Sequence, residues 1–369
     1  MTTVERPAAF SPFVTSKVTI PPTRPNLVAR PRLFEQLNTG LQHPLTLIAA
    51  PAGSGKTTLL SEWIASNAER QTLNDKDLIQ RSAFGVQGSD EASVQRSAFS
   101  VQRLNVAWVA LDPGDNDPAR FWSYIIRAIQ TVHAGFGDEL LTLLKSLQSP
   151  SSDSIATALA AELAAIPPEL VLALDDYHVI DTPAIHAALA YLLDHLPSHV
   201  HLVIISRKNP PLPLSRLRVR GQLTEIRADA LRFTGDESAT FLTERMGLHL
   251  DEADVAILEQ RTEGWIAGLQ LVALSMRNCA DIPGFIAAFS GSNRYILDYL
   301  ADEVFQRQPE PVLTFLLHTC ILDRLCGDLC DSLFTIDDLR LTIEEPQPEI
   351  VNRQSKSINS QEMLEHLEQ

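Results

Sequence analysis

The sequence predicts an α/β fold, in which a parallel sheet is covered by helices on both faces, followed by an all-helical domain. Short apolar segments of strand length recur between residues 45 and 228, and segments with helical spacing of their apolar residues lie between them. Apolar runs without alternation are typical of parallel strands that are buried on both faces. After residue 235 the pattern is almost entirely helical, which predicts the second domain.

Length and composition fit a globular chain with more than one core. The 369 residues are enough for two or three domains. Hydrophobic residues make up 45% and charged residues 21%, which excludes wholesale disorder and fibrous classes. The 30 basic and 46 acidic residues give a formal charge of −16, and no segment is dense in Lys or Arg. Such an acidic surface repels polyanions, so we expect no direct nucleic-acid binding by this chain.

The cysteine content and the N-terminus indicate the compartment. Four cysteines are too few for a disulfide framework, which predicts a reducing environment. Residues 1–26 contain no apolar run of signal-peptide length, and no later stretch reaches the roughly 18 apolar residues of a membrane span. We therefore expect a cytoplasmic protein that does not enter the membrane.

The predicted elements alternate between strand and helix. An extended, proline-rich tail over 1–26 precedes a short helix at 32–41. Helical spacing also follows the first strand, runs from residue 118 to about 165, and returns at 183–195. We assign the α/β domain to 27–234 and the helical domain to 235–308. The predicted strands are 45–50, 105–112, 170–180, 201–208 and 222–228.

One segment interrupts this alternation. The octapeptide QRSAFGVQ at 80–87 returns as QRSAFSVQ at 95–102, in a context rich in Ser, Gln and Asp. Two copies are too few for a stacked repeat architecture. We interpret residues 71–103 as a low-complexity insertion in a surface loop, rather than as a functional repeat.

Two groups of potential metal ligands have simpler interpretations. Asp112, Asp115 and Asp117 lack the glycine and glutamate spacing of a calcium loop. We expect turn and cap chemistry instead, with Asp117 capping a helix that begins at Pro118. One histidine and three cysteines near the C-terminus lack the paired spacing of a zinc site, so small core residues are favoured. These four are His318, Cys320, Cys326 and Cys330.

The strongest motif is APAGSGKT at residues 50–57, between the first strand and a helix. It is a phosphate-binding loop with Ala50 in place of the first glycine. Glycines let backbone N–H groups curl around phosphate oxygens, Lys56 reaches the terminal phosphates, and the hydroxyl of Thr57 binds Mg²⁺. The dipole of the following helix attracts anions. The motif predicts ATP or ADP with Mg²⁺, bound by Ala52, Gly53, Ser54, Gly55, Lys56, Thr57 and Thr58.

Two acidic residues end the third strand. Asp175 and Asp176 follow four apolar residues, at the sheet edge that faces the phosphate loop. A carboxylate in this place holds Mg²⁺, and we assign that role to Asp175. The second carboxylate, Asp176, is the candidate for orienting or deprotonating the attacking water. Surface turn residues are the alternative interpretation.

Basic residues follow the fourth strand. Arg207, after Ser206, occupies a place from which an arginine senses the γ-phosphate, and simple solvation at the sheet edge is the alternative. Arg216, Arg218 and Arg220 alternate with apolar residues. This alternation predicts that they share one face of an extended segment, for which solvation is again the simplest interpretation and contact with nucleotide or an acidic neighbour is the alternative.

These segments resemble the nucleotide-binding core of MalT-like regulators. Such proteins are LuxR-family, LAL-type transcriptional regulators whose ATPase is a STAND-class, AAA-related P-loop NTPase. The resemblance covers about residues 17–333 apart from the 71–103 insertion. It rests on LVARPRLFEQLNTGL, LIAAPAGSGKTTLLSEW, VAWVALDPGDNDPARFWSYII, LALDDYHVID, HLVIISRKNPPLPLSRLRVRGQLTEIRADALRF and TEGWIAGLQLVALS.

The resemblance implies roles for individual residues. It places Val28 and Arg30 near the adenine, and it makes Asp175 the Walker B acid and Asp176 the catalytic carboxylate. Arg207 matches the first sensor position, so Lys56, Asp176 and Arg207 form the expected catalytic set.

A helical motif is also implied to touch the nucleotide from the second domain. It contains Gly264, Trp265 and Gly268, although a core helix needs the same spacing. The family architecture further implies a winged helix over 309–369, here interrupted and cut short. In this family the winged helix packs within the molecule, so it adds no DNA-binding claim.

The implied function is a regulatory switch in signal transduction. ATP binding and slow hydrolysis control domain packing and self-association, and the physiological role is transcription regulation. Such regulators continue into a helical-repeat sensor and a LuxR-type helix-turn-helix, which we do not find here, so DNA contact falls outside this chain. The alternatives are a P-loop phosphotransferase or turnover ATPase, and a scaffold that holds ADP without hydrolysis.

Overall fold

The computed structural model divides the chain into two compact units, Met1–Ile286 and Ala287–Gln369. Most of the predicted insertion lies outside the described residues. The same holds for the C-terminal parts of the predicted helical domain and of the predicted winged helix. None of the described helices combines the length and apolar character that a membrane span needs. The described residues are 13–24, 27–83, 104–144, 151–166, 169–277, 279, 281–289, 309–322, 325–333, 360 and 363–364.

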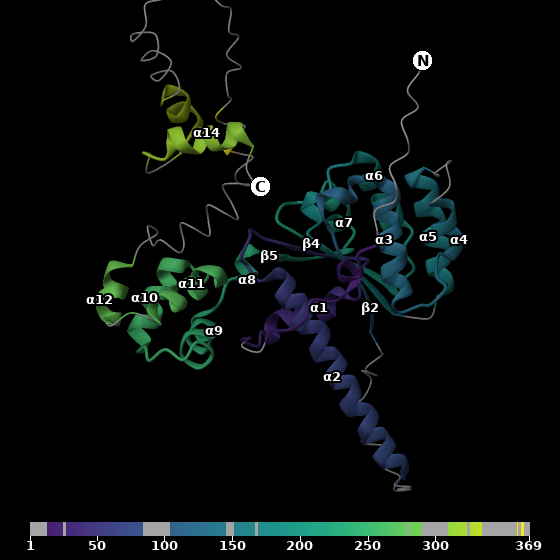
Figure 1. Cartoon of the computed structure of the whole chain (residues 1–369), viewed down its shortest axis with the longest axis horizontal. Helices are drawn as coiled ribbons and strands as arrows, with labels where there is room; N and C mark the ends of the chain where they lie inside the picture. Colours follow the sequence, from purple (N-terminus) through teal and green to yellow (C-terminus); the bar gives the residue numbers. More distant parts are fainter. Residues whose placement is uncertain are drawn as a thin grey trace, which may run out of the picture. The chain divides into compact units, whose positions relative to one another are not determined.

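The first unit contains a five-stranded parallel sheet in the order β2-β3-β4-β1-β5, which confirms the predicted fold class (Figure 1). Every residue of β1, β3 and β4 is buried, as expected for strands covered on both faces. Because β1 lies between β4 and the edge strand β5, the loop after β1 leaves the sheet from an inner strand. The strands are β1 (Leu45–Ala49), β2 (Asn105–Ala110), β3 (Leu170–Asp175), β4 (Val200–Ser206) and β5 (Leu223–Arg227).

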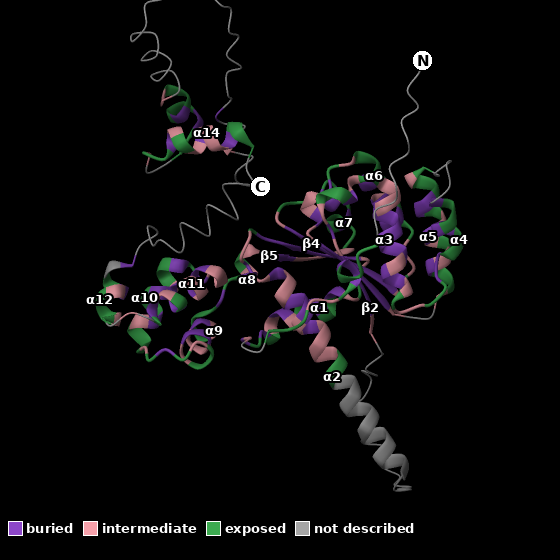
Figure 2. Cartoon of the chain, viewed as in Figure 1, coloured by how far each residue is buried: buried purple, intermediate pink, exposed green. Residues whose placement is uncertain are grey.

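Helices cover both faces of the sheet (Figures 1 and 2). One apolar core lies between the sheet and α1 (Pro31–Gly40) with α2 (Lys56–Ala83). The larger core, on the other face, contains apolar residues of α3–α7. Asp117 caps α3 and Pro118 is its first residue, as predicted. These helices are α3 (Pro118–Gln130), α4 (Asp138–Leu144), α5 (Ser152–Ala165), α6 (Pro183–Asp194) and α7 (Leu214–Val219).

Three segments differ from the prediction. The helix α2 extends to Ala83, inside the predicted insertion, over a sequence rich in good helix formers. The tail forms a 3-10 turn, η1 (Thr15–Val18), and is not extended there. The segment with alternating arginines is helix α7, because the i, i+3 spacing of its buried residues Leu214 and Leu217 dominates over the alternation.

Helices follow the sheet in the first unit, as predicted. The linker helix α8 (Ala228–Leu231) leads to α9 (Gly235–Ala239) and the π-helical turn η5 (Thr240–Arg245). Three further helices follow: α10 (Glu252–Thr262), α11 (Ile266–Met276) and α12 (Ile282–Ala288), the last of which includes the boundary after Ile286.

In the second unit, α14 spans Glu310–Thr319. Cys330 is buried there, whereas Cys320 and Cys326 are exposed, so the core interpretation is wrong for these two cysteines. The apolar residues next to them in the chain, Ile321 and Leu325, are themselves exposed, so neither cysteine belongs to a core segment.

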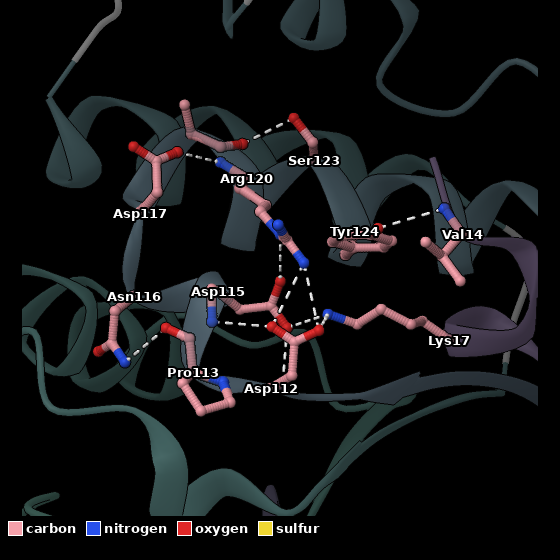
Figure 3. A network of polar contacts seen from close by, with 12 residues as sticks. Val14, Lys17, Asp112, Pro113, Asp115, Asn116, Asp117, Arg120, Ser123 and Tyr124 are labelled. Atoms are coloured by element: carbon pink, nitrogen blue, oxygen red, sulfur yellow. Dashed lines mark hydrogen bonds and ion pairs between the residues drawn. The ribbon is translucent and has the colours of Figure 1, made fainter. Parts of the chain in front are cut away.

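A polar network fixes the N-terminal segment to the edge strand β2 (Figure 3). The Lys17 ammonium pairs with Asp112, at 3.0 Å, and with Asp115. Asp115 is fully buried, and the guanidinium of Arg120 donates to it at 2.8 Å. Asp112 and Asp115 also form a capping box around the 3-10 turn η3 (Pro113–Asn116), which confirms the turn-and-cap interpretation of these aspartates.

Removing Lys17 tests how much this network stabilises the unit. In Lys17→Met the buried carboxylate of Asp115 keeps only Arg120 as a cation, so the free energy of unfolding is expected to fall by about 1–3 kcal/mol. Urea denaturation followed by circular dichroism measures it. The control Lys208→Met removes an exposed lysine and is expected to change stability by less than about 0.5 kcal/mol. Equal stability of Lys17→Met and wild type would mean that Arg120 alone compensates the carboxylate.

Candidate functional site

The phosphate loop lies between β1 and α2, at the carboxyl edge of the sheet. Gly53 and Gly55 have φ angles of +74° and +75°, a region that glycine adopts without strain. Lys56 is buried, with 8% of its surface exposed. Its ammonium group donates to the carbonyl oxygens of Ala50, at 2.7 Å, and Pro51, at 2.9 Å. The loop therefore wraps around its own lysine, which can exchange these carbonyls for phosphate oxygens.

The start of α2 faces the end of β3 across β4. The hydroxyl of Thr57 donates to the carboxylate of Asp175, at 3.0 and 3.1 Å from its two oxygens. Burial, and next the charge of Asp176, raises the pKa of Asp175 to about 6. A hydroxyl and a carboxylate at this spacing are the oxygen ligands that Mg²⁺ takes, so the two residues fit the predicted metal role.

Asp176 follows in a left-handed conformation, with φ 56° and ψ 36°. Its side chain is 50% exposed, and its carboxylate lies 3.8 Å from Nδ1 of His178. Burial lowers the pKa of His178 to about 4, so the imidazole is neutral near pH 7. A half-exposed carboxylate beside a neutral imidazole suits a group that accepts a proton from water.

Arg207 is half-buried immediately after β4. Burial first, and then the charge of Arg207, lowers the pKa of Lys56 to about 8. The positive charges of Lys56 and Arg207 repel each other, so a bound anion would stabilise both of them. The structure thus brings together the predicted residues Lys56, Thr57, Asp175, Asp176 and Arg207.

A cavity of about 280 Å³ adjoins the loop. Val28 and Arg30 line it together with Gly55 and Thr58, whereas Ala52, Gly53 and Ser54 are not among its lining residues. The guanidinium of Arg30 donates to the carbonyl oxygens of Leu231 and Arg232, so it also fastens the linker after β5. The lining comprises Arg24, Leu27, Val28, Arg30, Gly55, Thr58, Leu59, Glu62, Phe233, Phe241, Met246, Ile266 and Gln270.

Sequence reasoning missed several residues of this site. Glu62 lines the cavity four residues after Thr58, and that helical spacing could have identified it. Burial raises the pKa of Glu62. His178 stands two residues after Asp176, close enough to have been considered. Phe233 and Phe241 come from the linker and α9–η5, and no local pattern marks them as cavity residues.

The helical motif lies against the loop. The indole N–H of Trp265 donates to the carbonyl oxygen of Ala52 at 3.1 Å, and the backbone N–H of Ala267 donates to that of Gly53 at 3.2 Å. Ile266, between them, lines the cavity. The start of α11 therefore contacts the phosphate loop through backbone atoms of the loop.

The chain is similar in sequence to several known proteins. Residues 301–369 match the MalT winged helix domain family. The HTH-type transcriptional regulator MalT of Cronobacter sakazakii is 34% identical over 90% of this chain and 33% of its own. The serine/threonine-protein kinase PknK of Mycobacterium tuberculosis is 31% identical over 87% of this chain and 26% of its own. The Walker-type ATPase PABY2304 of Pyrococcus abyssi superposes with a TM-score of 0.49 at 16% identity, covering 94% of this chain and 90% of its own.

The chain spans about a third of the length of MalT and about a quarter of the length of PknK. The similarity to MalT extends over nine tenths of the chain and includes both the phosphate loop region and the winged-helix segment. The resemblance predicted from the sequence is confirmed: the chain is similar to MalT over nine tenths of its length, and its sheet has the parallel arrangement of a P-loop fold.

Proposed function

Because the chain is MalT-like over nine tenths of its length, we propose that it is the ATP-binding and slowly hydrolysing switch module of a STAND-class regulator. The nucleotide state would control domain packing and self-association in the cytoplasm, in the service of transcription regulation by a LuxR-family, AAA-related protein. DNA contact would fall to parts outside this chain, because its acidic surface repels polyanions.

One observation carries the proposal. Lys56, Thr57, Asp175, Asp176 and Arg207 meet at the carboxyl edge of the sheet, beside a cavity of about 280 Å³. Ligands of parallel α/β sheets bind at this edge.

Each residue of the set has a task in binding or hydrolysing ATP. Lys56 and the loop N–H groups would bind the phosphates, and Thr57 with Asp175 would hold Mg²⁺, whose charge offsets that of the phosphates. Asp176 would take a proton from the attacking water, and Arg207 would stabilise charge on the γ-phosphate.

The two curated relatives support a module with a shared internal task. One is named as a transcriptional regulator and the other as a protein kinase, yet both are similar to this chain over a fraction of their length. A segment that occurs in a transcriptional regulator and in a kinase fits a switch that controls the activity of another part of the same protein. The cavity of about 280 Å³ adjoins the phosphate loop, as a nucleoside site would, and the sequence shows no residue set that identifies an acceptor substrate.

Nucleotide-dependent assembly tests the proposal. Size-exclusion chromatography with light scattering compares the chain in ADP and in a slowly hydrolysed ATP analogue with Mg²⁺. We expect a monomer in ADP and a larger species in the analogue, because a ligand shifts an equilibrium only toward the state that it binds better. Lys56→Ala is the control and should stay monomeric in both. The same mass for the wild type in both nucleotides would refute control of self-association.

A further inference from the structure

We infer that the start of α11 acts as a clamp that presets the phosphate loop, so that Trp265 and the backbone N–H of Ala267 are positioning groups for phosphate binding. The inference rests on the proposed nucleotide site and goes beyond it. Here the helical part of the first unit contributes to affinity through the loop backbone, without touching the phosphates.

The clamp consists of two hydrogen bonds to consecutive carbonyls. Trp265 Nε1 donates to Ala52 at 3.1 Å and the N–H of Ala267 donates to Gly53 at 3.2 Å. Ile266 stands between the two donors, and a Cβ added at Gly55 would lie 2.9 Å from its Cδ1. The loop therefore touches α11 at each of these three places.

These contacts determine the direction in which the N–H groups of the phosphate loop point. In a trans peptide, the carbonyl of one residue and the N–H of the next point to opposite sides. Holding the carbonyls of Ala52 and Gly53 toward α11 therefore turns the N–H groups of Gly53 and Ser54 away from it. Gly53 and Gly55 both have left-handed φ angles, and left-handed residues are typical of loops whose successive N–H groups surround an anion.

The glycines of the helical motif hold the clamp in place. Gly264 has a φ of +68°, its carbonyl accepts from the N–H of Phe233 at 2.9 Å, and an added Cβ would lie 2.5 Å from the Phe233 carbonyl oxygen. A Cβ at Gly268 would lie 2.7 Å from the Trp265 ring, so only glycine admits the indole there. The two glycines therefore fix the positions of the Trp265 indole and of the N-terminus of α11.

Deleting the indole donor tests the clamp. Trp265→Phe keeps an aromatic ring and removes the N–H, so the dissociation constant for ADP should rise about fivefold, the value of one hydrogen bond. The affinity for adenosine, measured by competition with a fluorescent ADP analogue, should stay within about twofold, because Trp265 does not line the cavity. Trp63→Phe is the matched control: it removes an indole donor to Asn38, at 2.8 Å, and should change neither affinity.

A second variant removes the backbone donor. Ala267→Pro deletes the N–H at the second position of α11, where the first turn tolerates proline. The matched control is Ala253→Pro, with the same residue type at the second position of α10. Ala267→Pro should weaken ADP binding about fivefold, and Ala253→Pro should not.

The outcomes separate the two proposals. ADP affinity unchanged in both Trp265→Phe and Ala267→Pro, or adenosine and ADP weakened equally, would overturn the clamp while the nucleotide site stands. A wild-type chain that binds no ADP would overturn the proposed function and the clamp together. Circular dichroism confirms that each variant is folded before its affinity is compared.

Discussion

Lys56→Ala is expected to raise the dissociation constants for ADP and ATP about a hundredfold, which corresponds to ~2.7 kcal/mol. The substitution removes the buried ammonium around which the loop is wrapped, and with it the cation for the terminal phosphates. Titration with a fluorescent ADP analogue measures the change. The fold should survive, because the ammonium donates only to loop carbonyls among the described residues.

Two further variants define what Lys56 contributes. Lys208→Ala removes an exposed lysine after β4 and should leave the dissociation constants within about twofold. Lys56→Arg keeps the charge but cannot enter the same small space, so an intermediate affinity is expected. Unchanged ADP affinity in Lys56→Ala would show that the nucleotide does not bind at this loop.

Asp176→Asn is expected to abolish turnover while nucleotide binding is retained. Asparagine tolerates the left-handed conformation of residue 176, so the substitution removes the carboxylate and leaves the backbone unstrained. We expect the rate constant of ATP hydrolysis to fall about 10²–10⁴-fold, as for loss of a general base, and the ADP dissociation constant to stay within about twofold. Single-turnover hydrolysis and equilibrium titration measure the two quantities.

The matched control lies at the other end of the same strand. Glu169 is also acidic, has a φ of +71°, and directly precedes β3 at the edge away from the loop. Glu169→Asn should leave hydrolysis unchanged. If Asp176→Asn still hydrolyses ATP at the wild-type rate, another group activates the water. Negligible hydrolysis by the wild type, with ADP tightly bound, would favour the non-hydrolysing scaffold.

The sheet and the loop were predictable because their signals are local. Strands buried on both faces must be continuously apolar, so β1, β3 and β4 are visible as runs in the sequence. The chemistry of phosphate binding needs glycines, a lysine and a hydroxyl in consecutive positions. Asp175 could be placed because it ends an apolar run that must be a strand.

The remaining features depend on contacts between distant residues. Trp265 and Ala52 are 213 positions apart, and nothing near either residue identifies the other as its partner. The proline content of residues 1–26 predicted an extended tail, yet the ammonium group of Lys17 in this segment pairs with Asp112 and Asp115. At α7 and its C-cap, three alternating arginines predicted an extended segment, whereas the buried residues Leu214 and Leu217 follow helical spacing.

The sheet order has a consequence for synthesis of the chain on the ribosome. The inner strand β1 pairs with β4 and β5, and β4 begins about 150 residues after β1 ends. At a synthesis rate of about 5–20 residues per second, β1 therefore remains without its partner strands for roughly 8–30 s, and both of its backbone edges are unpaired. The phosphate loop waits longer, because its partners on α11 follow β5. A nascent chain of this protein would thus expose unpaired strand edges during that interval, and it would reach its full affinity for nucleotide only after α11 has emerged.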